Sequence, residues 1–569
     1  MFKKTNPQQD LFGVDTQLSE GLRRRLRESW AHLFKVEILP ILLRSEEQFS
    51  CLYGDTGRPN FSVARVLGLC LLQEYNALSD QQALDAFGFD VRWRYALDAN
   101  DEHAYFSRRS LVEFRRRLAA KDPDMTLIRG IFEKIGGRAI KKLGLSASQQ
   151  RLDSTLVVSN IHRRGRLDLF ANTISVFIRS LDKDRFSRIP KHIRQWYERE
   201  PEGWFGLPQD QHKTKLEQLA RYARKLIAVF KNDKEVASSK PYELLVRLVQ
   251  EQCEIKTDTS KGGNEKITMK KKPKGESLQS AFDPDASYGH KGSGYSAHIT
   301  ETCNNRGKNE IITDYEIHGA ARCDIGKAPN IVDRLEAAGL KPDKLFADGG
   351  YPSAPSTLNV IRRDVEFIAP VNRGRLSDDV MGRDQFKFDK KGFVVKCPKG
   401  HKPLDHRILS HNNKKGRSLH AIFDGDTCRR CSVLDNCPVR APNHRARGCR
   451  PRDTLGDFRL EITPELRLRD QMYSNQQTAQ WKDQYKIRSG IEATMSELKR
   501  SHGMGKLRVR RAPKVRFAVA CKVIACNIKR WAKATASCPS FQLFIGLIFR
   551  RLAALGANIN KLGFSTIFN

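Results

Sequence analysis

The sequence lacks an apolar run of 18 residues, the length that a membrane-spanning helix requires. Residues 541–549 come closest, and the pair Arg550 and Arg551 ends them, so we expect a buried or partner-facing helix there. The first ten residues, MFKKTNPQQD, also lack the apolar core of a secretion signal. These absences argue against a membrane protein and predict a soluble, cytoplasmic one.

Acidic residues are scarce relative to basic ones. The chain of 569 residues contains 65 Asp and Glu against 101 Lys and Arg, which gives a formal net charge of +36. Such an excess predicts attraction to a polyanion, and nucleic acid bound in a strongly salt-dependent way is the first choice. An anionic membrane surface is the competing polyanion. The length exceeds one ordinary core and suggests about three or four domains.

Disulfide bonds are not expected either, because the thirteen cysteines are an odd number in a long intracellular chain. Four of them form two groups about thirty residues apart: Cys397 in CPKGH, then Cys428, Cys431 and Cys437. Four thiolates fill the coordination sphere of a tetrahedral zinc ion, which would make the zinc structural rather than catalytic. We therefore predict a small zinc-ribbon-like insertion over residues 390–450. His401 or Cys449 could replace one ligand, and reduced, unligated cysteines are the alternative.

Residues 1–125 have the periodicity of an all-α domain. Ser79 and Ser110 are each followed three residues later by Gln or Glu, as at helix starts. The helix expected after Ser110 carries Arg115 and Arg116 beside its apolar face. We predict a DNA-binding or dimerisation domain with a basic helix. A packing domain with solvated arginines is the alternative.

Short β-branched segments appear after this helical domain. LDSTLVVSN predicts a strand that carries Asp153, and a β-β-α-β series is expected over residues 295–348. Its last strand ends in Asp348-Gly-Gly-Tyr, where side chains are well placed for chemistry and glycines allow close approach. A turn or edge position is the alternative for either aspartate. These elements predict a mixed α/β fold.

Two segments interrupt the sheet, the cysteine-rich one and an earlier one over residues 162–280. The earlier segment has helical periodicity over residues 170–181, 216–230 and 242–252. A tract rich in lysine and glycine, residues 256–275, is expected to be flexible and to run along a phosphate backbone. We predict an α-helical insertion. A solvated linker with helices of no special role is the alternative.

One stretch near the C-terminus carries four polar residues at helical spacing: Tyr485, Arg488, Glu492 and Lys499. At about 100° per residue the last three fall within roughly 60° of the tyrosine, whereas Glu497 points about 120° away. A carboxylate that holds a metal ion, beside cations that grip phosphate oxygens, suits a phosphate-handling site. A solvated, salt-bridged helix surface is the alternative, and Gly490 weakens a helix that runs through it.

Three acids on these elements, Asp153, Asp348 and Glu492, are separated by the two insertions. Two Mg²⁺ ions about 3.5–4 Å apart need a bridging carboxylate and one or two further acids, and the ions' charge would keep all three ionised. The chain beyond this point is basic, and the basic run leads into an amphipathic helix over residues 515–532. It is predicted to contact phosphates; a solvated charge run is the alternative.

These motifs together resemble bacterial insertion-sequence transposases of the DDE class, which have an RNase H-like core. The spacing Y-x2-R-x3-E-x6-K and the ADGGY turn carry the resemblance. Weaker matches are the LDST strand, Asp283-Pro-Asp285, Gly294-Tyr295, His318-Gly319, the cysteines and Asn527. The resemblance covers residues from about 30 to 535, and the helical insertion after Asp153 is where the chain departs from the simplest members.

The resemblance implies that Asp153, Asp348 and Glu492 are the catalytic triad that binds two Mg²⁺ or Mn²⁺ ions. It also implies DNA contacts near the cut bond from three residues of the helical face: Tyr485, Arg488 and Lys499. Further DNA contacts are expected from five arginines: Arg115, Arg116, Arg508, Arg510 and Arg511. The catalytic core would comprise residues 145–161, 281–375 and 470–535, followed by a C-terminal helical tail over residues 536–569.

The expected function is that of a transposase on the bacterial nucleoid, acting on double-stranded DNA as a homodimer. It would bind the terminal inverted repeats of its insertion sequence, cut the ends with water and transfer the freed 3′-hydroxyls to target DNA. A Mg-dependent nuclease without strand transfer is one alternative. A DNA-binding regulator with an inactive core is the other.

Overall fold

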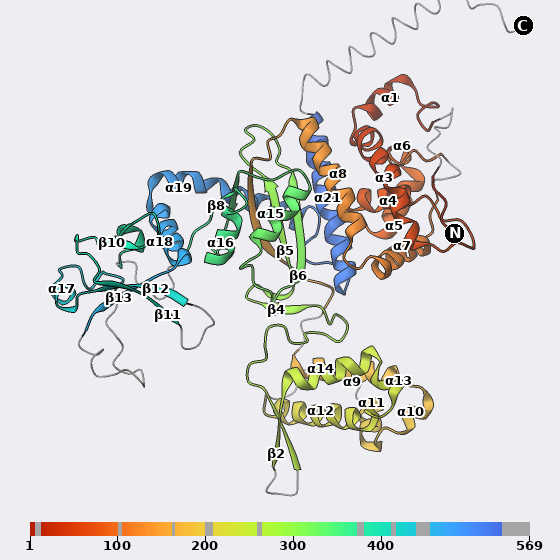
Figure 1. The fold of residues 1–569 in the computed structure, drawn as a ribbon. Helices are drawn as coiled ribbons and strands as arrows, with labels where there is room; N and C mark the ends of the chain where they lie inside the picture. The colour runs from red at the N-terminus through yellow and green to blue at the C-terminus, as the bar shows by residue number, and fades with distance from the viewer. Residues whose placement is uncertain are drawn as a thin grey trace, which may run out of the picture.

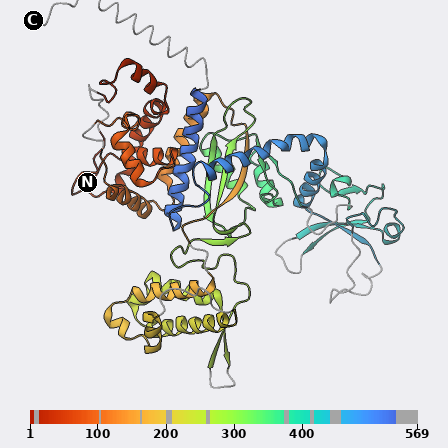
Figure 2. The ribbon, with the colours of Figure 1, turned by 180° about the vertical axis from the view of Figure 1, so that it is seen from behind.

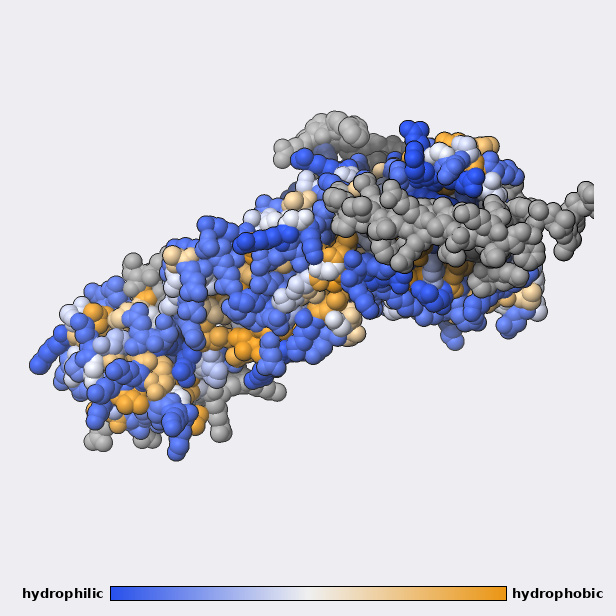
Figure 3. Space-filling model, turned by 90° about the horizontal axis from the view of Figure 1, so that it is seen from above, coloured by the Kyte–Doolittle hydropathy of each residue, from blue (hydrophilic) through white to orange (hydrophobic). Residues whose placement is uncertain are grey.

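The structure is a computed structural model that describes residues 1–5, 13–100, 105–161, 165–199, 209–258, 264–372, 380–410, 417–439 and 456–536. A helical N-terminal part lies against a central sheet, a second group of helices lies below the sheet, and small sheets lie at the far side (Figure 1). No helix in these ranges is both long enough and apolar enough to cross a membrane. Seen from above, the surface is mostly hydrophilic with small apolar patches (Figure 3).

The N-terminal part is helical, as predicted. Its helices are α1 (Glu20–Arg27), α2 (Trp30–Leu33), η1 (Phe34–Ile38), α3 (Leu39–Ser45), η2 (Glu46–Leu52), α4 (Val63–Tyr75), α5 (Asp80–Phe89), α6 (Val91–Ala96), α7 (Arg108–Lys121) and α8 (Thr126–Leu143). The capping box at Ser79 is confirmed, since Ser79 and Gln82 each accept the other's backbone N–H. The helix start at Ser110 is wrong: α7 begins after Ser107, whose hydroxyl accepts the N–H of Ser110.

The central sheet is mixed, and the prediction of a mixed α/β fold is confirmed. Its strands follow the order β4 (Ser287–Gly289), β5 (Gly292–Thr302), β1 (Gln149–Val157), β7 (Lys344–Ala347) and β8 (Glu366–Ile368), and β6 (Ile312–Gly319) also pairs with β5. The β5 strand is antiparallel to β1 and to β6, whereas β7 runs parallel to β1 and β8 runs parallel to β7. Parallel strands need crossover connections, here α15 (Ala328–Ala337) and α16 (Ala354–Ile361).

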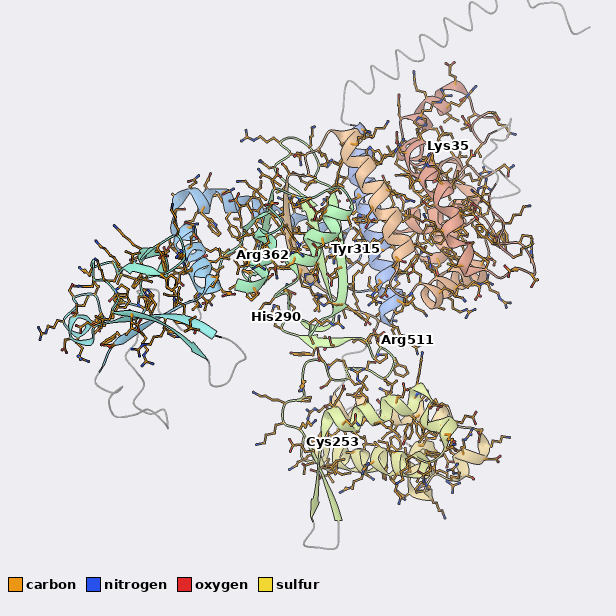
Figure 4. The ribbon with its side chains drawn as sticks, viewed as in Figure 1. Lys35, Cys253, His290, Tyr315, Arg362 and Arg511 are labelled. Carbon is orange, nitrogen blue, oxygen red and sulfur yellow. The ribbon has the colours of Figure 1, made fainter. Side chains whose placement is uncertain are left out.

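Side chains alternate between the two faces of this sheet. Leu152, Leu345 and Ala347 pack against α15 and α16, whereas Phe346 faces the other way, toward the C-terminal helices. Tyr315 on β6 contacts α8, where Phe132 meets its ring edge-on (Figure 4). The N-terminal helices, α8 and the long helix α21 (Ala512–Ala536) share one hydrophobic core with β5 and β6.

The insertion after β1 has its own hydrophobic core. Its helices are α9 (Arg166–Arg179), α10 (Lys183–Ser187), α11 (Lys191–Arg199), α12 (Gln209–Phe230), α13 (Lys234–Ala237) and α14 (Lys240–Gln252). The lysine-rich tract after them is not simply flexible, because β2 (Cys253–Asp258) and β3 (Asn264–Met269) pair as an antiparallel hairpin. Its alternating Thr, Ile and charged residues favour a strand. The prediction of flexibility rested on the lysine content and did not consider this alternation. Cys253 lies where this hairpin leaves the helices (Figure 4).

The cysteine-rich part contains short strands around a small apolar core. Its elements are η4 (Arg383–Gln385), β9 (Lys387–Phe388), β10 (Val394–Lys396), β11 (Asp405–Ser410), β12 (Arg417–Phe423), α17 (Gly425–Arg429) and β13 (Phe458–Ile462). β11, β12 and β13 form one antiparallel sheet, and β9 pairs with β10. Cys449 and residues 541–549 lie outside the described residues, as does the expected C-terminal tail beyond Ala536.

The C-terminal segment is not the single helix expected over Tyr485 and its neighbours. The chain forms α18 (Pro464–Gln477), α19 (Ala479–Tyr485), the 3₁₀ turn η6 (Lys486–Gly490) and α20 (Ile491–Arg500) before α21. Seen from behind, this segment crosses the face of the central sheet (Figure 2). The tighter turn changes the angular spacing of the polar residues, although Arg488 and Glu492 still pair at i,i+4 spacing.

A buried ion network joins this segment to the sheet. Glu301 on β5 is completely buried and pairs with Arg151 on β1 at 2.7 Å and with Arg530 on α21 at 2.9 Å. Thr494 on α20 donates its hydroxyl to the same carboxylate at 2.6 Å. One acid thus connects two strands and two helices, and its charge balances buried guanidinium groups.

Glu301→Gln should lower the free energy of unfolding by about 3 kcal/mol, because both arginines lose the buried charge that balances them. Urea unfolding followed by tryptophan fluorescence measures the change. The matched control is Glu113→Gln, whose exposed carboxylate pairs with Arg116 and Arg117 and contributes little. If both variants lose the same small amount, Glu301 does not hold these elements together.

Candidate active site

The parallel ladder between β1 and β7 brings the first two candidate acids together. Its register pairs Leu152 with Ala347, so the next residues, Asp153 and Asp348, follow side by side. Leu152 and Ala347 both face α15 and α16, and alternation therefore directs the two aspartates to the opposite face. Asp153 is largely buried, whereas Asp348 lies just past the end of β7 and is one-third exposed.

The third acid reaches this place through Arg488. The guanidinium Nη2 of Arg488 lies 2.7 Å from Asp153 Oδ2 and 3.9 Å from Asp348 Oδ2, and Nη1 lies 3.2 Å from Glu492 Oε1. Glu492, at the start of α20, is 68% exposed, while Arg488 is only 16% exposed. The structure thus gathers the three predicted acids around one guanidinium.

The η6 turn is held in place by Arg151. Its guanidinium donates to the carbonyl of Ile487 at 2.9 Å while it is paired with Glu301. A Cβ on Gly490 would collide with this guanidinium, so the glycine that weakens a helix is required here for close approach. The contact between β1 and η6 sets the position of Arg488 and Glu492 over the sheet.

Tyr485 has a positioning contact rather than a free hydroxyl. Its hydroxyl donates to the carbonyl of Ala347 at 3.2 Å, directly before Asp348. Its ring stacks on Trp481 with centroids 4.7 Å apart and packs on Phe346. This fixes the end of β7 against α19.

The electrostatics of Asp153 reflect its mixed surroundings. Burial raises the pKa of its carboxyl above the usual value, and the neighbouring charge of Asp348 adds to this. The Arg488 guanidinium acts in the opposite direction and favours the carboxylate. The guanidinium thus offsets part of the effect of burial on the pKa of Asp153.

Two residues beside the site, Asp324 and Lys291, were not predicted from the sequence. Asp324 Oδ2 accepts the hydroxyl of Ser154 at 2.7 Å, and Lys291 donates to the carbonyl of Ser154 at 2.8 Å. A Cβ on Gly350 would lie 3.0 Å from Asp348 Oδ1 and 3.9 Å from Asp324 Oδ2, so these acids border one glycine. Asp324 lies in the loop before α15, where no motif or periodicity marks it.

A buried hydrogen-bond chain supports the turn after Asp348. His318 Nδ1 lies 3.0 Å from the carbonyl of Gly319, so it donates and leaves Nε2 as an acceptor. His298 Nε2 then donates to His318 at 2.6 Å, and the Tyr351 hydroxyl donates to His298 Nδ1 at 2.6 Å. Burial lowers the pKa of both histidines, that of His298 to about 3, so the chain is neutral near pH 7.

The basic segment after α20 runs beside the end of β1. Val158 donates to the carbonyl of Gly505 at 3.1 Å and accepts from Leu507 at 2.8 Å, while Arg510 Nε donates to the carbonyl of Asn160. Lys506 and Arg508 are exposed on either side of buried Leu507, which gives the alternation of an extended strand. Arg511 is exposed at the start of α21 (Figure 4).

The other predicted cations have different surroundings. Lys499 is exposed on α20, and its stem lies near Gly505. On α7, Arg116 is exposed and pairs with Glu113. Arg115 is instead directed inward, where it pairs with Asp80 at 2.8 Å and donates to Gln73 at 2.6 Å. These contacts hold α4, α5 and α7 together.

The four predicted zinc ligands line one cavity of about 240 Å³: Cys397, Cys428, Cys431 and Cys437. The N–H of His401 donates to Cys397 Sγ at 3.3 Å in a tight turn, where Gly400 has φ +88°, a conformation that favours glycine. Burial, and then the neighbouring thiols, raise the pKa of Cys428 to about 11.

A further group of ligand-type side chains was not predicted. Glu497, His502 and Cys526 each place one ligand atom within 4.8 Å of the ligand atoms of the other two. Two N–H groups of Arg530 already bind the Glu497 carboxylate at 2.8 and 2.9 Å. A resident cation therefore already balances this acid.

Comparison with protein-family models identifies two parts of the chain. The model of a transposase DDE domain matches residues 396–532, and a model of a transposase domain matches residues 22–117. The protein is a DDE-type transposase of the insertion-sequence kind. No curated protein and no solved structure matches the chain.

The two matched stretches include only some of the candidate site residues. The DDE match includes the cysteines and the segment from Tyr485 to Lys499, whereas Asp153 and Asp348 lie outside both matches. The mixed sheet together with this match fits an RNase H-like fold. DNA is the substrate that the transposase family implies, and such enzymes use divalent metal ions such as Mg²⁺.

Gly490→Ala should lower the free energy of unfolding by about 1–3 kcal/mol, because the new methyl group displaces the Arg151 guanidinium from η6. The matched control is Gly137→Ala in α8, where a Cβ meets open space and should stabilise the helix by up to about 1 kcal/mol. Urea unfolding of both variants checks the difference. Equal effects would show that Arg151 does not require a glycine at this turn.

Proposed function

We propose that this transposase cuts DNA at the ends of its insertion sequence and joins the freed 3′-hydroxyls to target DNA. The observation that carries the proposal is the convergence of Asp153, Asp348 and Glu492 on one guanidinium, from three elements far apart in the sequence. Three carboxylates this close together repel one another unless a cation balances them, so their convergence favours a shared cation-binding role. Their oxygens form the donor set that hard divalent cations prefer.

The three acids would hold two Mg²⁺ or Mn²⁺ ions. Two features fit: the donors are all carboxylate oxygens, and Asp153 and Asp348 directly follow the last paired residues of the β1–β7 ladder. When bound, the ions would supply Lewis-acid stabilisation of the attacking and leaving oxygens of phosphoryl transfer. The protein's own contribution is to hold the three acids in place against the central sheet.

Cations around the acids would bind the DNA backbone. Arg488 would bind a phosphate near the cut bond as a fork, and Lys499 would add a point charge further along α20. Lys506, Arg508, Arg510 and Arg511 would continue this surface along the end of β1. Tyr485 would position the end of β7 through its hydrogen bond to Ala347.

The N-terminal helices and the helical insertion would recognise the inverted repeats. Arg116 is the exposed arginine of α7 that suits a DNA contact, whereas Arg115 would keep that helix in place. Two ends have to be joined, so a homodimer is the expected species on DNA, associated with the nucleoid. The net charge of +36 supports binding that weakens steeply with salt.

Zinc is the proposed structural ion of the cysteine-rich part. Four thiols line one cavity, which is the number of ligands that a closed tetrahedral zinc site needs, and a backbone N–H is directed at Cys397 Sγ. The ion would cross-link the Cys397 turn to the segment of Cys428, Cys431 and Cys437, whose apolar core is small. This part would then fold only with metal bound.

Asp348→Asn should abolish Mg²⁺-dependent cleavage of DNA that carries the element's ends, because one of the metal-binding oxygens is lost. DNA binding should persist or tighten, since a charge that repels phosphate is gone. Cleavage and strand transfer of a pre-cut end are measured on the same labelled DNA. A cutting Asp348→Asn variant would move the site elsewhere, and cleavage by the wild type without strand transfer would make it a nuclease.

The purified transposase should contain about one zinc ion per chain. Cys428→Ser should remove it and lower the melting temperature of the cysteine-rich part, because one ligand is lost. Atomic emission spectroscopy and thermal melts measure both, with Cys51→Ser, an exposed cysteine of the N-terminal part, as the control. Wild-type protein that purifies without zinc and melts at the same temperature as Cys428→Ser would refute the zinc site.

A further inference from the structure

Arg488 contacts the same carboxylate oxygens that the divalent ions need. Its Nη2 binds Asp153 Oδ2 at 2.7 Å and approaches Asp348 Oδ2, while its Nη1 binds Glu492 Oε1. A Mg²⁺ ion requires about six oxygen ligands at 2.0–2.1 Å. A guanidinium at hydrogen-bond distance from these oxygens occupies that space, so Arg488 and the ions cannot hold the acids at the same time.

Arg488 leaves one of its hydrogen-bond donors unused. Its Nε–H is buried and has no acceptor among the described residues. Arg530, a structural arginine in the neighbouring helix, differs: all three of its nitrogens donate, to Glu301, Glu497, Thr494 and the carbonyl of Glu310. Since an unpaired buried donor costs free energy, Arg488 gains if it moves to a ligand that accepts from its whole fork.

We propose that Arg488 is the resident counter-ion of the metal site, which metal binding displaces and which the DNA phosphate then receives. Before metal binds, its guanidinium contacts Asp153, Asp348 and Glu492 and holds them close together, so the site is assembled in advance. The inference rests on the proposed metal-dependent function and adds a competition within it. Arg488 is thus a positioning residue first and a phosphate ligand afterwards.

Competition of this kind couples metal and DNA. If the ions displace Arg488, free metal makes the guanidinium available to a phosphate; by linkage, a phosphate that takes Arg488 tightens metal binding by the same factor. The transposase would therefore bind divalent ions weakly when alone and more tightly on DNA. Because of this coupling, the three acids would hold divalent ions mainly when the enzyme is bound to DNA.

The test is Mn²⁺ binding to the full-length protein without DNA, followed by the electron paramagnetic resonance of free Mn²⁺. Arg488→Gln should bind Mn²⁺ about tenfold more tightly than wild type, because it removes a cation that competes at contact distance. Arg488→Lys keeps a charge on a shorter side chain and should fall between them. Lys486→Gln, in the same turn η6, removes an exposed charge that pairs with Asp483 rather than with the three acids, and it should change the affinity little.

Thermal melts add a second readout. In EDTA, Arg488→Gln should melt below wild type, because the three carboxylates lose their counter-ion, and saturating Mn²⁺ should reduce that difference. A short duplex DNA should tighten Mn²⁺ binding more in wild type than in Arg488→Gln. Equal tightening in both would overturn the exchange of Arg488 from acid to phosphate.

The failures of the two proposals are distinguishable. Asp348→Asn should weaken Mn²⁺ binding in both the wild-type and the Arg488→Gln background. If it does so but Arg488→Gln binds Mn²⁺ no more tightly than wild type, Arg488 is not a competing counter-ion and the metal site stands. If Asp348→Asn leaves Mn²⁺ binding unchanged, the acids are not the metal site and the proposed function fails with the inference.

Discussion

The parallel pairing of β1 with β7 is the constraint on which the candidate site depends. Its last pair is Leu152 with Ala347, so Asp153 and Asp348 follow side by side, although almost 200 residues of chain, including the helical insertion, separate them. Backbone hydrogen bonds fix strands about 4.8 Å apart, so the distance between the aspartate backbones is set by the sheet and not by their own repulsive side chains. The insertion can therefore have its own core without disturbing the site.

Buried ion pairs hold the segment of Arg488 and Glu492 against the central sheet. Arg151 connects β1 to η6, and Glu301 balances both Arg151 and Arg530, so the segment that carries Arg488 and Glu492 is tied to the sheet by ions rather than by apolar packing alone. Such a network is costly to bury and strongly destabilising to break, which favours one geometry over alternatives. A phosphate-handling site benefits from that, since small displacements weaken positioning.

The sequence predicted which residues meet at the candidate site better than it predicted the local structure that positions them. Strand pattern and the ADGGY turn located two acids, and the spacing after Tyr485 located the third together with Arg488. The prediction of a single α-helix from Tyr485 to Lys499 was wrong at the 3₁₀ turn η6, where Arg151, a residue distant in the sequence, binds the carbonyl of Ile487 and packs against Gly490. Asp324 carried no local signal, since only its tertiary contact with Ser154 brings it to the acids.

The most direct test of the account is the anomalous scattering of Mn²⁺ in crystals of the transposase bound to DNA. The account predicts a metal peak between Asp153 and Asp348 with Glu492 as a ligand, and Arg488 turned from the acids to a phosphate. A strong Mn²⁺ peak elsewhere in the protein, with the three acids still held by Arg488, would contradict the claim that these carboxylates form the catalytic metal site.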